Sequence, residues 1–551
     1  MLFRSWSLLR DRRRLQAIRA KLGETPAHAV FGDERLDVLD HFRDYPGAER
    51  CGWQVKVDVP RRGTHLLLIE VQDEAGAWHI AHSRPVRRSG KAAPPPPNTY
   101  GAWVAAYDAL TPESAAHIRS KLAGLTRRPL ISVILPVYNT PEKLLVAAIE
   151  SVRRQLYENW ELCISDDASK QPHVRKVLER YQRKDPKRIK VVLRETNGHI
   201  SANSNSALAL AHGEYIALLD HDDELRAHAL ACVALELDAH PEADVVYSDE
   251  DKIDENGHRY DHYFKPDWNP DLFNVQNFIS HLGVYRTLLV REVGGFRVGY
   301  EGSQDWDLAM RVIERSGPDR IRHIPKILYH WRSVPGSTAM LIGEKPFAAV
   351  AAEKVITEHF IRTGVEATIS PTKGSYWRVH YPVPDPAPRV TLIIPTRNRL
   401  NVLRPCVESL LAKTTYPNFE LLIVDNDSDD AETLAYLKEI SSAAGAEGRA
   451  AVRVIHSPGE FNYSALNNLG VENTDAPLVG LLNNDLEVIH GDWLHEMVSH
   501  ALRPEIGCVG AKLYYPDDRI QHAGVILGIG GVAAHAWQTH PRGAAGQAHR
   551  N

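Results

Sequence analysis

Two stretches of this 551-residue sequence match each other without a gap, and this repeat constrains the fold more than any other feature. Residues 390–428 follow residues 131–169 at a constant offset, so that Pro395 falls on Pro136. Proline, asparagine and acidic positions recur throughout the two stretches. A match over so many positions indicates two copies of one domain.

Within the first copy, short apolar runs alternate with segments of helical spacing. The β-branched run at residues 130–136 is followed by a helical pattern at 140–156 and by a second apolar run at 160–167. Strand, helix and strand in this order indicate parallel strands joined by crossover helices. We therefore predict an α/β fold with a mostly parallel sheet, repeated in the second copy. Such sheets bind ligands at the carboxyl ends of their strands, where we expect Asp166, Asp167, Asp220 and Asp222.

The chain is too long for a single core, and its patterns divide most of it into four parts. Residues 25–90 hold short alternating runs between turn residues, typical of a small antiparallel, β-sandwich-like module. The proline run within residues 91–128 predicts a stiff linker followed by helices. Residues 129–385 are expected to form the complete first copy. Residues 386–551 are expected to form a second copy that is incomplete at its carboxyl end.

The amino-terminal residues are strongly basic. Residues 1–22 hold seven Arg or Lys against one Asp, and their aliphatic side chains have helical spacing. We predict a basic amphipathic helix over residues 1–24. Such a helix either rests on an anionic membrane surface or packs on its own protein with its charges facing water.

Composition narrows the classes of function. A net charge of -5 and a pI near 6.6 argue against a nucleic-acid partner. The five cysteines are scattered without a CxxC pair, which excludes the usual zinc and redox motifs and favours a reducing, cytoplasmic setting. No apolar run approaches the roughly 18 to 20 residues of a membrane-spanning helix, and no signal-peptide pattern is present.

Asp220, His221 and Asp222 directly follow an apolar run, at the expected end of a strand. Two carboxylates at i and i+2 can point into one cleft and hold a hard divalent cation, Mg²⁺ or Mn²⁺, whose other positions are left to water and phosphates. The alternative is a solvated turn, but the position after a buried strand favours a metal site. Asp223 and Glu224 are expected to form the polar start of the next helix.

Six motifs occur in the order "ISVILPVYN", "ISDDAS", "NGHISANSNSALALAHGEYIALLDHDDEL", "YSDEDKID", "GGF" and "GSQDWDLAMRV". In order and spacing they resemble the family 2 glycosyltransferases with the GT-A fold, of the tandem-domain type found in bacterial O-antigen and exopolysaccharide biosynthesis. The resemblance covers residues 129–381 fully and 388–551 partly. It implies a metal-dependent, inverting transfer of a hexosyl or deoxyhexosyl group from a nucleotide-diphosphate sugar to an acceptor hydroxyl, in the assembly of O-antigen, lipopolysaccharide or exopolysaccharide.

The resemblance also implies roles for individual residues. The nucleotide-sugar donor is expected to contact Pro136, Val137, Tyr138, Asn139, Asp166, Asp167, Asn205, Asp220 and His221. Asp220 and Asp222 match the metal-binding pair of the family, and His330 matches a third metal ligand of some members. Asp305, in "GSQDWDL", occupies the place of the general base that takes the proton of the acceptor.

Several of these residues have a purely structural alternative. Ser303, Asp305 and Asp307 also suit the start of a helix. His330, beside Trp331, is as easily a packed, hydrogen-bonded side chain. An acceptor-side or supporting position is expected for Asp249, Glu250, Asp251 and Trp306. For the three acids, a solvated acidic loop is the alternative.

The second copy departs from this pattern. Asn483 stands where the first copy has Asp220, whereas Asp425 and Asp485 keep a carboxylate. No counterpart of Asp305 follows within the sequence. We expect the second copy, as given, to be inactive or to be the front of a truncated domain.

We interpret the chain as a cytoplasmic glycosyltransferase. Its expected partners are a nucleotide-diphosphate sugar, a saccharide or lipid-linked saccharide acceptor and, through the basic helix, the cytoplasmic face of the inner membrane. A sugar nucleotidyltransferase is disfavoured because no Gly-rich phosphate loop with Arg or Lys follows the first strand. A non-catalytic glycan-binding or scaffold protein is the other alternative, and the intact Asp220, Asp222 and Asp305 count against it.

Overall fold

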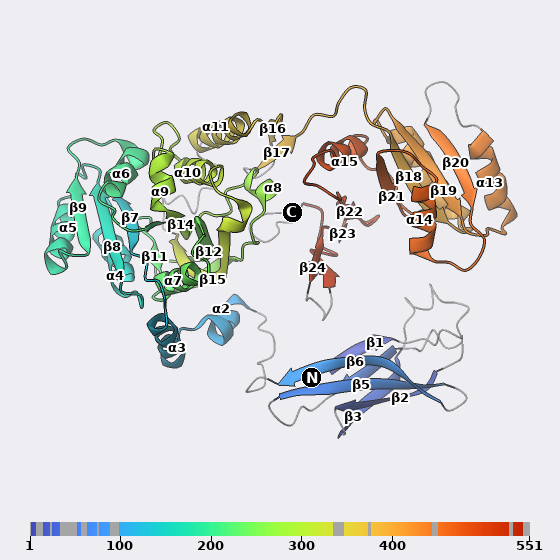
Figure 1. Cartoon of the computed structure of the whole chain (residues 1–551), viewed down its shortest axis with the longest axis horizontal. Coiled ribbons are helices and arrows are strands. Elements are labelled where there is room, and N and C mark those ends of the chain that lie inside the picture. The colour runs from blue at the N-terminus through green and yellow to red at the C-terminus, as the bar shows by residue number, and fades with distance from the viewer. Residues whose placement is uncertain are drawn as a thin grey trace. The chain divides into compact units, whose positions relative to one another are not determined.

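The computed structural model describes residues 2–6, 15–22, 25–33, 52–56, 63–73, 77–88, 99–333, 346–372, 376–442, 450–527 and 533–543. Two compact units make up the chain, Met1–Tyr107 and Asp108–Asn551 (Figure 1). Among the described residues, none of the helices has the length and apolar character needed to cross a membrane.

The amino-terminal unit contains an antiparallel sheet, which confirms the predicted antiparallel module. Counting described residues only, six strands lie in the order β1-β4-β3-β2-β5-β6, and each neighbouring pair is antiparallel. The strands are β1 Leu2–Trp6, β2 Leu15–Leu22, β3 Thr25–Asp33, β4 Gly52–Lys56, β5 Gly63–Asp73 and β6 Trp78–Arg88.

The basic helix predicted over residues 1–24 is wrong, because β1 and β2 occupy this segment. Strand β2 pairs with β3 on one side and with β5 on the other. Arg19 and Lys21 share a face of the strand, and their side chains lie 2.7 and 3.8 Å from the carboxylate of Glu70. The Arg19 guanidinium also stacks over the ring of Trp78. Pairing along both edges outweighs a helical pattern, and the membrane contact inferred from that helix loses its basis.

Short helices follow the sheet, as predicted. They are α2 Tyr100–Trp103, the π-helix η2 Val104–Asp108 and α3 Pro112–Ala123. Thr111 caps α3 by accepting a hydrogen bond from the N–H of Ser114, and Pro112 occupies the first turn. The proline run at residues 91–98 lies outside the described residues.

The sheet of the first copy has parallel strands in its first half, as predicted, and includes antiparallel strands in the rest. Strands β7 Ile131–Val137, β8 Trp160–Asp166, β9 Ile189–Leu193 and β10 Tyr215–Leu218 are parallel neighbours. Beyond β10, in the described residues, the nine-stranded sheet continues through β14, β12, β15 and β11, with β13 beside β12. These strands are β11 Glu224–Leu225, β12 Val245–Ile253, β13 Arg259–Tyr263, β14 Gly283–Arg286 and β15 Ile321–Arg332. Strand β14 is antiparallel to both β10 and β12.

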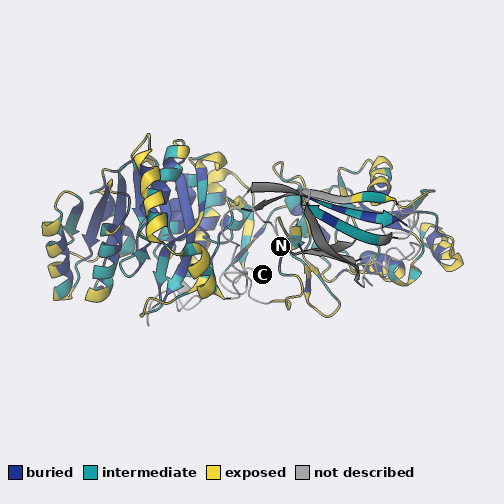
Figure 2. Cartoon of the chain, turned by 90° about the horizontal axis from the view of Figure 1, so that it is seen from below, coloured by how far each residue is buried: buried dark blue, intermediate teal, exposed yellow. Residues whose placement is uncertain are grey.

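Helices cover both faces of this sheet, and Figure 2 shows the strands as the buried layer. One face carries a core that includes Leu145, Val174 and Leu230. The other carries a core that includes Ala207, Leu308 and Val355. The helices are α4 Glu142–Arg153, α5 Pro172–Lys184, α6 His199–Leu208, α7 Ala229–Ala239, α8 Pro270–Phe273, α9 Thr287–Glu292, α10 Gln304–Ile313, the 3-10 helix η3 Pro318–Arg320 and α11 Pro346–Thr363. The hairpin β16 Thr368–Pro371 and β17 Trp377–His380 follows.

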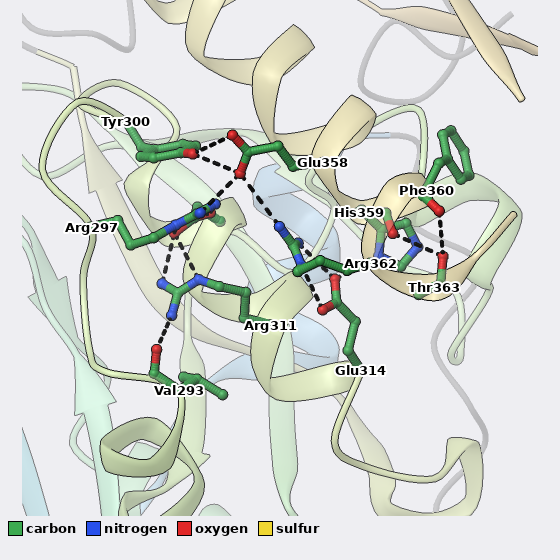
Figure 3. A network of polar contacts seen from close by, with 11 residues as sticks. Val293, Arg297, Tyr300, Arg311, Glu314, Glu358, His359, Phe360, Arg362 and Thr363 are labelled. Atoms are coloured by element: carbon green, nitrogen blue, oxygen red, sulfur yellow. Dashed lines mark hydrogen bonds and ion pairs between the residues drawn. The ribbon is translucent and has the colours of Figure 1, made fainter.

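A polar network joins α11 to the end of α10 and to the loop that precedes α10 (Figure 3). Glu358 of α11 accepts a hydrogen bond from Tyr300 at 2.7 Å and pairs with Arg297 at 2.8 Å. Arg362, one turn further, pairs with Glu314 just after α10 at 2.7 Å. These contacts hold the helix that begins at Gln304 in a fixed position.

The second copy repeats the parallel half of the first. Within the described residues its four strands lie in the order β20-β19-β18-β21. The strands are β18 Val390–Thr396, β19 Phe419–Asp425, β20 Ala451–His456 and β21 Leu478–Leu481. The helices are α12 Leu400–Lys413, α13 Ala431–Ser442, α14 Tyr463–Glu472 and α15 Trp493–Ala501. Two small hairpins follow, β22 Leu513–Tyr514 with β23 Ile520–His522 and β24 Val525–Leu527 with β25 Ala533–His535.

The duplication predicted from the sequence extends to individual contacts. Tyr157 donates its hydroxyl hydrogen to the carbonyl of Pro129 at 2.8 Å, and Tyr416 does the same to Pro388 at 2.7 Å. The mixed α/β fold predicted from the alternating runs, present twice, is confirmed.

Candidate functional site

The loop after β7 exposes the ring of Tyr138 to solvent. Pro136 and Val137 are buried as the last two residues of β7, whereas Tyr138 is 40% exposed. The backbone N–H of Asn139 donates to Ser169 Oγ at 2.8 Å, and the Asn139 side-chain oxygen accepts from the N–H of residue 170 at the same distance. Asn139 therefore ties this loop to the loop after β8.

Two adjacent aspartates at the end of β8 have different partners. Asp167 is buried and accepts from Arg194 Nε at 2.8 Å and from the N–H of Gly198 at 2.9 Å. Asp166 accepts from the N–H of Ser169 through Oδ2, while its buried Oδ1 has no hydrogen-bond partner among the described residues. Burial raises the pKa of Asp166. Asp167 is thus held by two donors, whereas Asp166 keeps one buried oxygen unpaired among the described residues.

Helix α6 carries a second buried oxygen of this kind, on a residue that the sequence did not single out. Asn203 donates through Nδ2 to the carbonyl of Val137 at 3.1 Å, and its Oδ1 has no partner in the described part of the chain. Asn205, predicted to contact the donor, instead exchanges two hydrogen bonds with the backbone of Phe296, at 2.7 and 2.9 Å. Residues two apart on a helix point to different sides, so Asn203 reaches the end of β7 and Asn205 does not. The sequence carries no local signal that separates the two asparagines.

The acidic motif after β10 is partly open to solvent. The Asp220 side chain is 46% exposed, and its Oδ2 lies 3.7 Å from His281 Nε2. Burial alone would raise the pKa of Asp220, but its interactions with the positive charges of His281 and His221 outweigh it and lower the pKa. His221 Nδ1 lies 3.7 Å from Asp222 Oδ1, and burial raises the pKa of Asp222.

The polar helix start expected at Asp223 and Glu224 is wrong. Asp223 is fully buried and accepts from the hydroxyl of Tyr329 at 2.6 Å and from the N–H of Arg332 at 2.7 Å. Glu224 lies in β11, which pairs with β15, and α7 begins only at Ala229. Burial, together with the charges of the neighbouring aspartates, raises the pKa of Asp223 well above its usual range.

The set of residues with metal-ligand spacing differs from the predicted one. Among the described residues, ligand atoms of Asp220, Asp223 and His281 lie within 4.8 Å of one another. His330, predicted as the third ligand, contacts Asp251 through Nδ1. Carboxylate oxygens are the ligands that Mg²⁺ and Mn²⁺ prefer, so the residues around Asp220 fit such a cation. The metal role of Asp222 and His330 stays a prediction.

His281 connects this motif to a buried ion pair. Its Nδ1 lies 3.2 Å from Glu250 Oε2, and its ring stacks on Tyr329 at 4.5 Å between centroids. Glu250 also pairs with the buried Lys265 at 3.1 Å. Burial opposes ionisation of Glu250, but Lys265 and His281 outweigh it and lower the pKa of Glu250 to about 2. Burial also opposes protonation of His281, yet the two carboxylates raise its pKa well above the ordinary value.

The three acids of "YSDED" are not a solvated loop, so that alternative is wrong. They lie on β12 and are buried. Asp249 accepts from His323 at 2.9 Å and from the N–H of Lys265 at 2.8 Å. Asp251 is enclosed by Arg259 and His330. Glu250 is paired with Lys265 and His281, so each of the three acids has a basic partner. Through His281, this buried cluster connects to Asp220 of the acidic motif.

Asp305 stands in the first turn of α10, as its helix-start pattern predicts. Its Oδ2 accepts a hydrogen bond from Asn277 Nδ2 at 2.7 Å. Burial raises the pKa of Asp305, and the negative charge of Asp220 acts in the same direction. The acceptor-side position predicted for Trp306 is wrong, because this side chain is buried and its indole N–H donates to the carbonyl of Phe273 at 3.2 Å.

The corresponding region of the second copy is assembled differently. Asp425 is buried at the end of β19, whereas Asn483 and Asp485 are exposed. Asn426, at the place of Asp167, donates to the carbonyls of Ser457 and Gly459 at 2.9 and 3.0 Å. The same position thus accepts hydrogen bonds in the first copy and donates them in the second.

Comparison with known sequences decides the family. The sequence model of glycosyl transferase family 2 matches residues 132–294 and again residues 391–537, which together exceed half of the chain. The chain belongs to glycosyl transferase family 2. Both matched ranges begin at the first parallel strand of a copy, so the repeat seen in the sequence is a repeat of the family 2 domain.

Two relatives are similar to this family 2 chain over most of its length. It is 52% identical over 431 residues to the "Uncharacterized protein y4gI" of Sinorhizobium fredii, covering 77% of the chain and 46% of that protein. It is 38% identical over 537 residues to the "O-antigen biosynthesis protein RfbC" of Myxococcus xanthus, covering 96% of the chain and 40% of that protein. The chain therefore spans less than half the length of these relatives.

Solved structures also resemble the family 2 chain in part. The crystal structure of S. aureus TarS 1-349 in complex with UDP-GlcNAc is similar at a TM-score of 0.36 and 23% identity. The similarity covers 43% of this chain and 68% of that one.

Proposed function

We propose that the chain transfers a sugar from a nucleotide-diphosphate donor to an acceptor hydroxyl in the assembly of a bacterial surface polysaccharide, with the first copy as its active domain. Membership of family 2 supports the reaction class. The name of the Myxococcus relative, an O-antigen biosynthesis protein, supports the pathway class. The acceptor in such a reaction is a saccharide or a lipid-linked saccharide.

The observation that carries this proposal is the convergence of Asp220 and Asp305. They come from different elements, the end of β10 and the start of α10. Both are contacted by the segment between residues 277 and 281, through Asn277 and His281. This transfer needs a ligand for a cation and a base, and one short segment contacts a candidate for each.

Asp220 and Asp222 would hold a divalent cation, Mg²⁺ or Mn²⁺, with His330 as a further ligand. When bound, such a cation neutralises negative charge on the diphosphate leaving group. The Asp220 carboxylate supports this role, since it is 46% exposed and lies 3.7 Å from His281.

Asp305 would act as the base on the acceptor side. It takes the proton of the acceptor hydroxyl while that oxygen attacks the anomeric carbon from the face opposite the diphosphate, which inverts the configuration. Its raised pKa brings the carboxylate closer to the working pH of a proton acceptor.

The nucleoside would lie against the ends of β7 and β8. The buried oxygens of Asp166 and Asn203 without hydrogen-bond partners in the described residues support this placement, because a nucleobase N–H can satisfy such acceptors. The exposed ring of Tyr138 would pack on the base.

A screen of nucleotide sugars tests the function. Binding of each donor is measured by calorimetry with and without Mn²⁺, and release of the nucleoside diphosphate is followed. We expect one donor to bind only with the cation and to be turned over slowly without acceptor. Absence of cation-dependent binding across the panel would refute the proposal. Binding of glycan without any nucleotide would favour a scaffold protein, and release of pyrophosphate from a nucleoside triphosphate would favour a nucleotidyltransferase.

A further inference from the structure

The segment Asn277–His281 touches both acids of the proposed site. At one end, Asn277 Nδ2 donates to Asp305 Oδ2 at 2.7 Å. At the other end, His281 Nε2 lies 3.7 Å from Asp220 Oδ2. The two acids are far apart in the sequence and belong to different elements. One short segment therefore spans the distance between the proposed cation ligand and the proposed base.

The middle of the segment is anchored in the core. Phe278 and Ile279 are buried, and Phe278 packs edge-on against Tyr247 and Phe273 at 5.6 and 5.5 Å between centroids. The buried Lys265 Nζ donates to the carbonyl of Ile279 at 2.7 Å and also to the carbonyl of His281. Apolar packing and a buried cation thus fix the backbone of the segment.

Both polar ends have a fixed orientation. The side-chain oxygen of Asn277 accepts from the N–H of Ser280 at 3.2 Å, so its amide group faces Asp305. The N–H of His281 donates to Glu250 Oε2 at 3.0 Å, and its ring stacks on Tyr329. Neither end can rotate without breaking a second contact.

We propose that Asn277–His281 is a positioning element of the transfer reaction, in which Asn277 orients Asp305 and His281 orients Asp220. The inference rests on the proposed function for the roles of the two acids. A donor held against a carboxylate stabilises its charged form. A residue that orients a metal ligand changes the affinity for the metal. The two ends therefore have separable effects.

The first experiment replaces Asn277 in the full chain. Asn277→Ala should lower kcat about 10- to 100-fold, as expected for a lost hydrogen bond to a charged group, and should leave the affinity for Mn²⁺ alone unchanged. It should also move the acidic limb of the pH–rate profile upward by about one pH unit. The pKa of Asp305, read directly from the ¹³C carboxyl shift assigned with Asp305→Asn, should rise by a similar amount. The control is Asn256→Ala, at an exposed turn residue.

The second experiment replaces His281. His281→Ala should weaken binding of Mn²⁺ alone about 10- to 100-fold, measured by electron paramagnetic resonance of the free ion. It should leave the ¹³C pKa of Asp305 nearer to wild type than Asn277→Ala does. His281→Gln, which keeps an N–H donor for Asp220, should recover part of the affinity. The control is His258→Ala, since His258 is an exposed histidine paired with Asp254.

The outcomes separate this inference from the proposed function. If Asn277→Ala leaves the pKa of Asp305 unchanged, or if it weakens Mn²⁺ binding as much as His281→Ala does, the positioning role is overturned. If the wild-type chain neither binds Mn²⁺ nor turns over any nucleotide sugar, the proposed function fails instead. In that event the ¹³C titration of Asp305 still decides whether Asn277 controls its carboxylate.

Discussion

Replacement of Asp305 by asparagine separates catalysis from folding. General-base catalysis contributes about 100- to 10,000-fold, so its loss corresponds to about 2.7–5.4 kcal/mol of transition-state stabilisation. Asparagine has the same size as aspartate but cannot take the proton of the acceptor. We expect kcat to fall within that range while the affinity for the nucleotide-sugar donor stays at the wild-type value.

The effect of this change on stability should be smaller. Asp305 lies in the first turn of α10, where a carboxylate contributes about 0.3–1 kcal/mol through the helix dipole. Asn277 can still donate to the side-chain oxygen of the new asparagine, so the 2.7 Å hydrogen bond has a partner. The loss of a partly buried charge offsets the lost dipole interaction. The free energy of unfolding should therefore change by less than about 1 kcal/mol.

Asp307, two residues along the same helix, is the matched control. Its side chain is fully buried and forms ion pairs with Arg297 and with Arg311, the latter at 2.6 Å. Asp307→Asn leaves Arg311 without its counter-charge and Arg297 with Glu358 alone, which should cost about 3–5 kcal/mol of stability. Asp305→Asn should therefore lower turnover, whereas Asp307→Asn should lower the free energy of unfolding.

Turnover is measured as nucleoside diphosphate release, donor affinity by calorimetry, and stability by urea denaturation. Turnover by Asp305→Asn within error of wild type would refute the general-base assignment. A fall in stability as large as that of Asp307→Asn would show that Asp305 is a structural residue of α10.

Four further predictions concern the pH dependence of turnover, the metal, the buried Glu250 and the second copy. Burial raises the pKa of Asp305, so kcat should fall as pH decreases through a value above the ordinary aspartate pKa of about 3.9, which a pH–rate profile measures. Exhaustive chelation should abolish donor hydrolysis and added Mn²⁺ should restore it; full activity after chelation would exclude a metal role. Burial opposes ionisation of Glu250, but Lys265 outweighs it and lowers the pKa to about 2, so ionised Glu250 stabilises the fold above its unfolded pKa of about 4.3. Glu250→Gln should therefore cost about 3–5 kcal/mol at neutral pH in urea titrations, and the difference from wild type should shrink as pH falls toward 2. In the second copy, Asn426→Asp should cost about 1–3 kcal/mol, because a carboxylate would face two carbonyls; Asn418→Asp, at an exposed residue with one such bond, should cost less.

The parallel half of the fold could be predicted because its signals are local. Apolar runs such as that of β7 are buried on both faces, so they read as continuous strands, and the intervening helical spacing requires parallel pairing. Strand ends then place Asp166 and Asp220 at one edge of the sheet. The positions of these acids follow from chain order alone, without knowledge of any long-range contact.

The rest of the site depends on pairings between distant residues. Strand β12 pairs with β14 and β15, and this brings Glu250 beside His281 and Asp251 beside His330. No local pattern in "YSDED" distinguishes a buried, paired cluster from a solvated loop, since the partners lie up to 79 residues away. Asp223 was misassigned for the same reason, because its partners lie on β15.

The exchange of Asp167 for Asn426 shows how far a substitution can be interpreted from sequence. Read alone, it suggests a lost carboxylate and a weakened site. In the first copy, however, Asp167 accepts from Arg194 and from the N–H of Gly198, so its charge supports a loop. In the second copy the facing groups are carbonyls, and an amide that donates is the residue type that satisfies them. The substitution is therefore matched by its surroundings. Asn483 at the place of Asp220 differs from it in kind, because there an uncharged side chain replaces a proposed cation ligand.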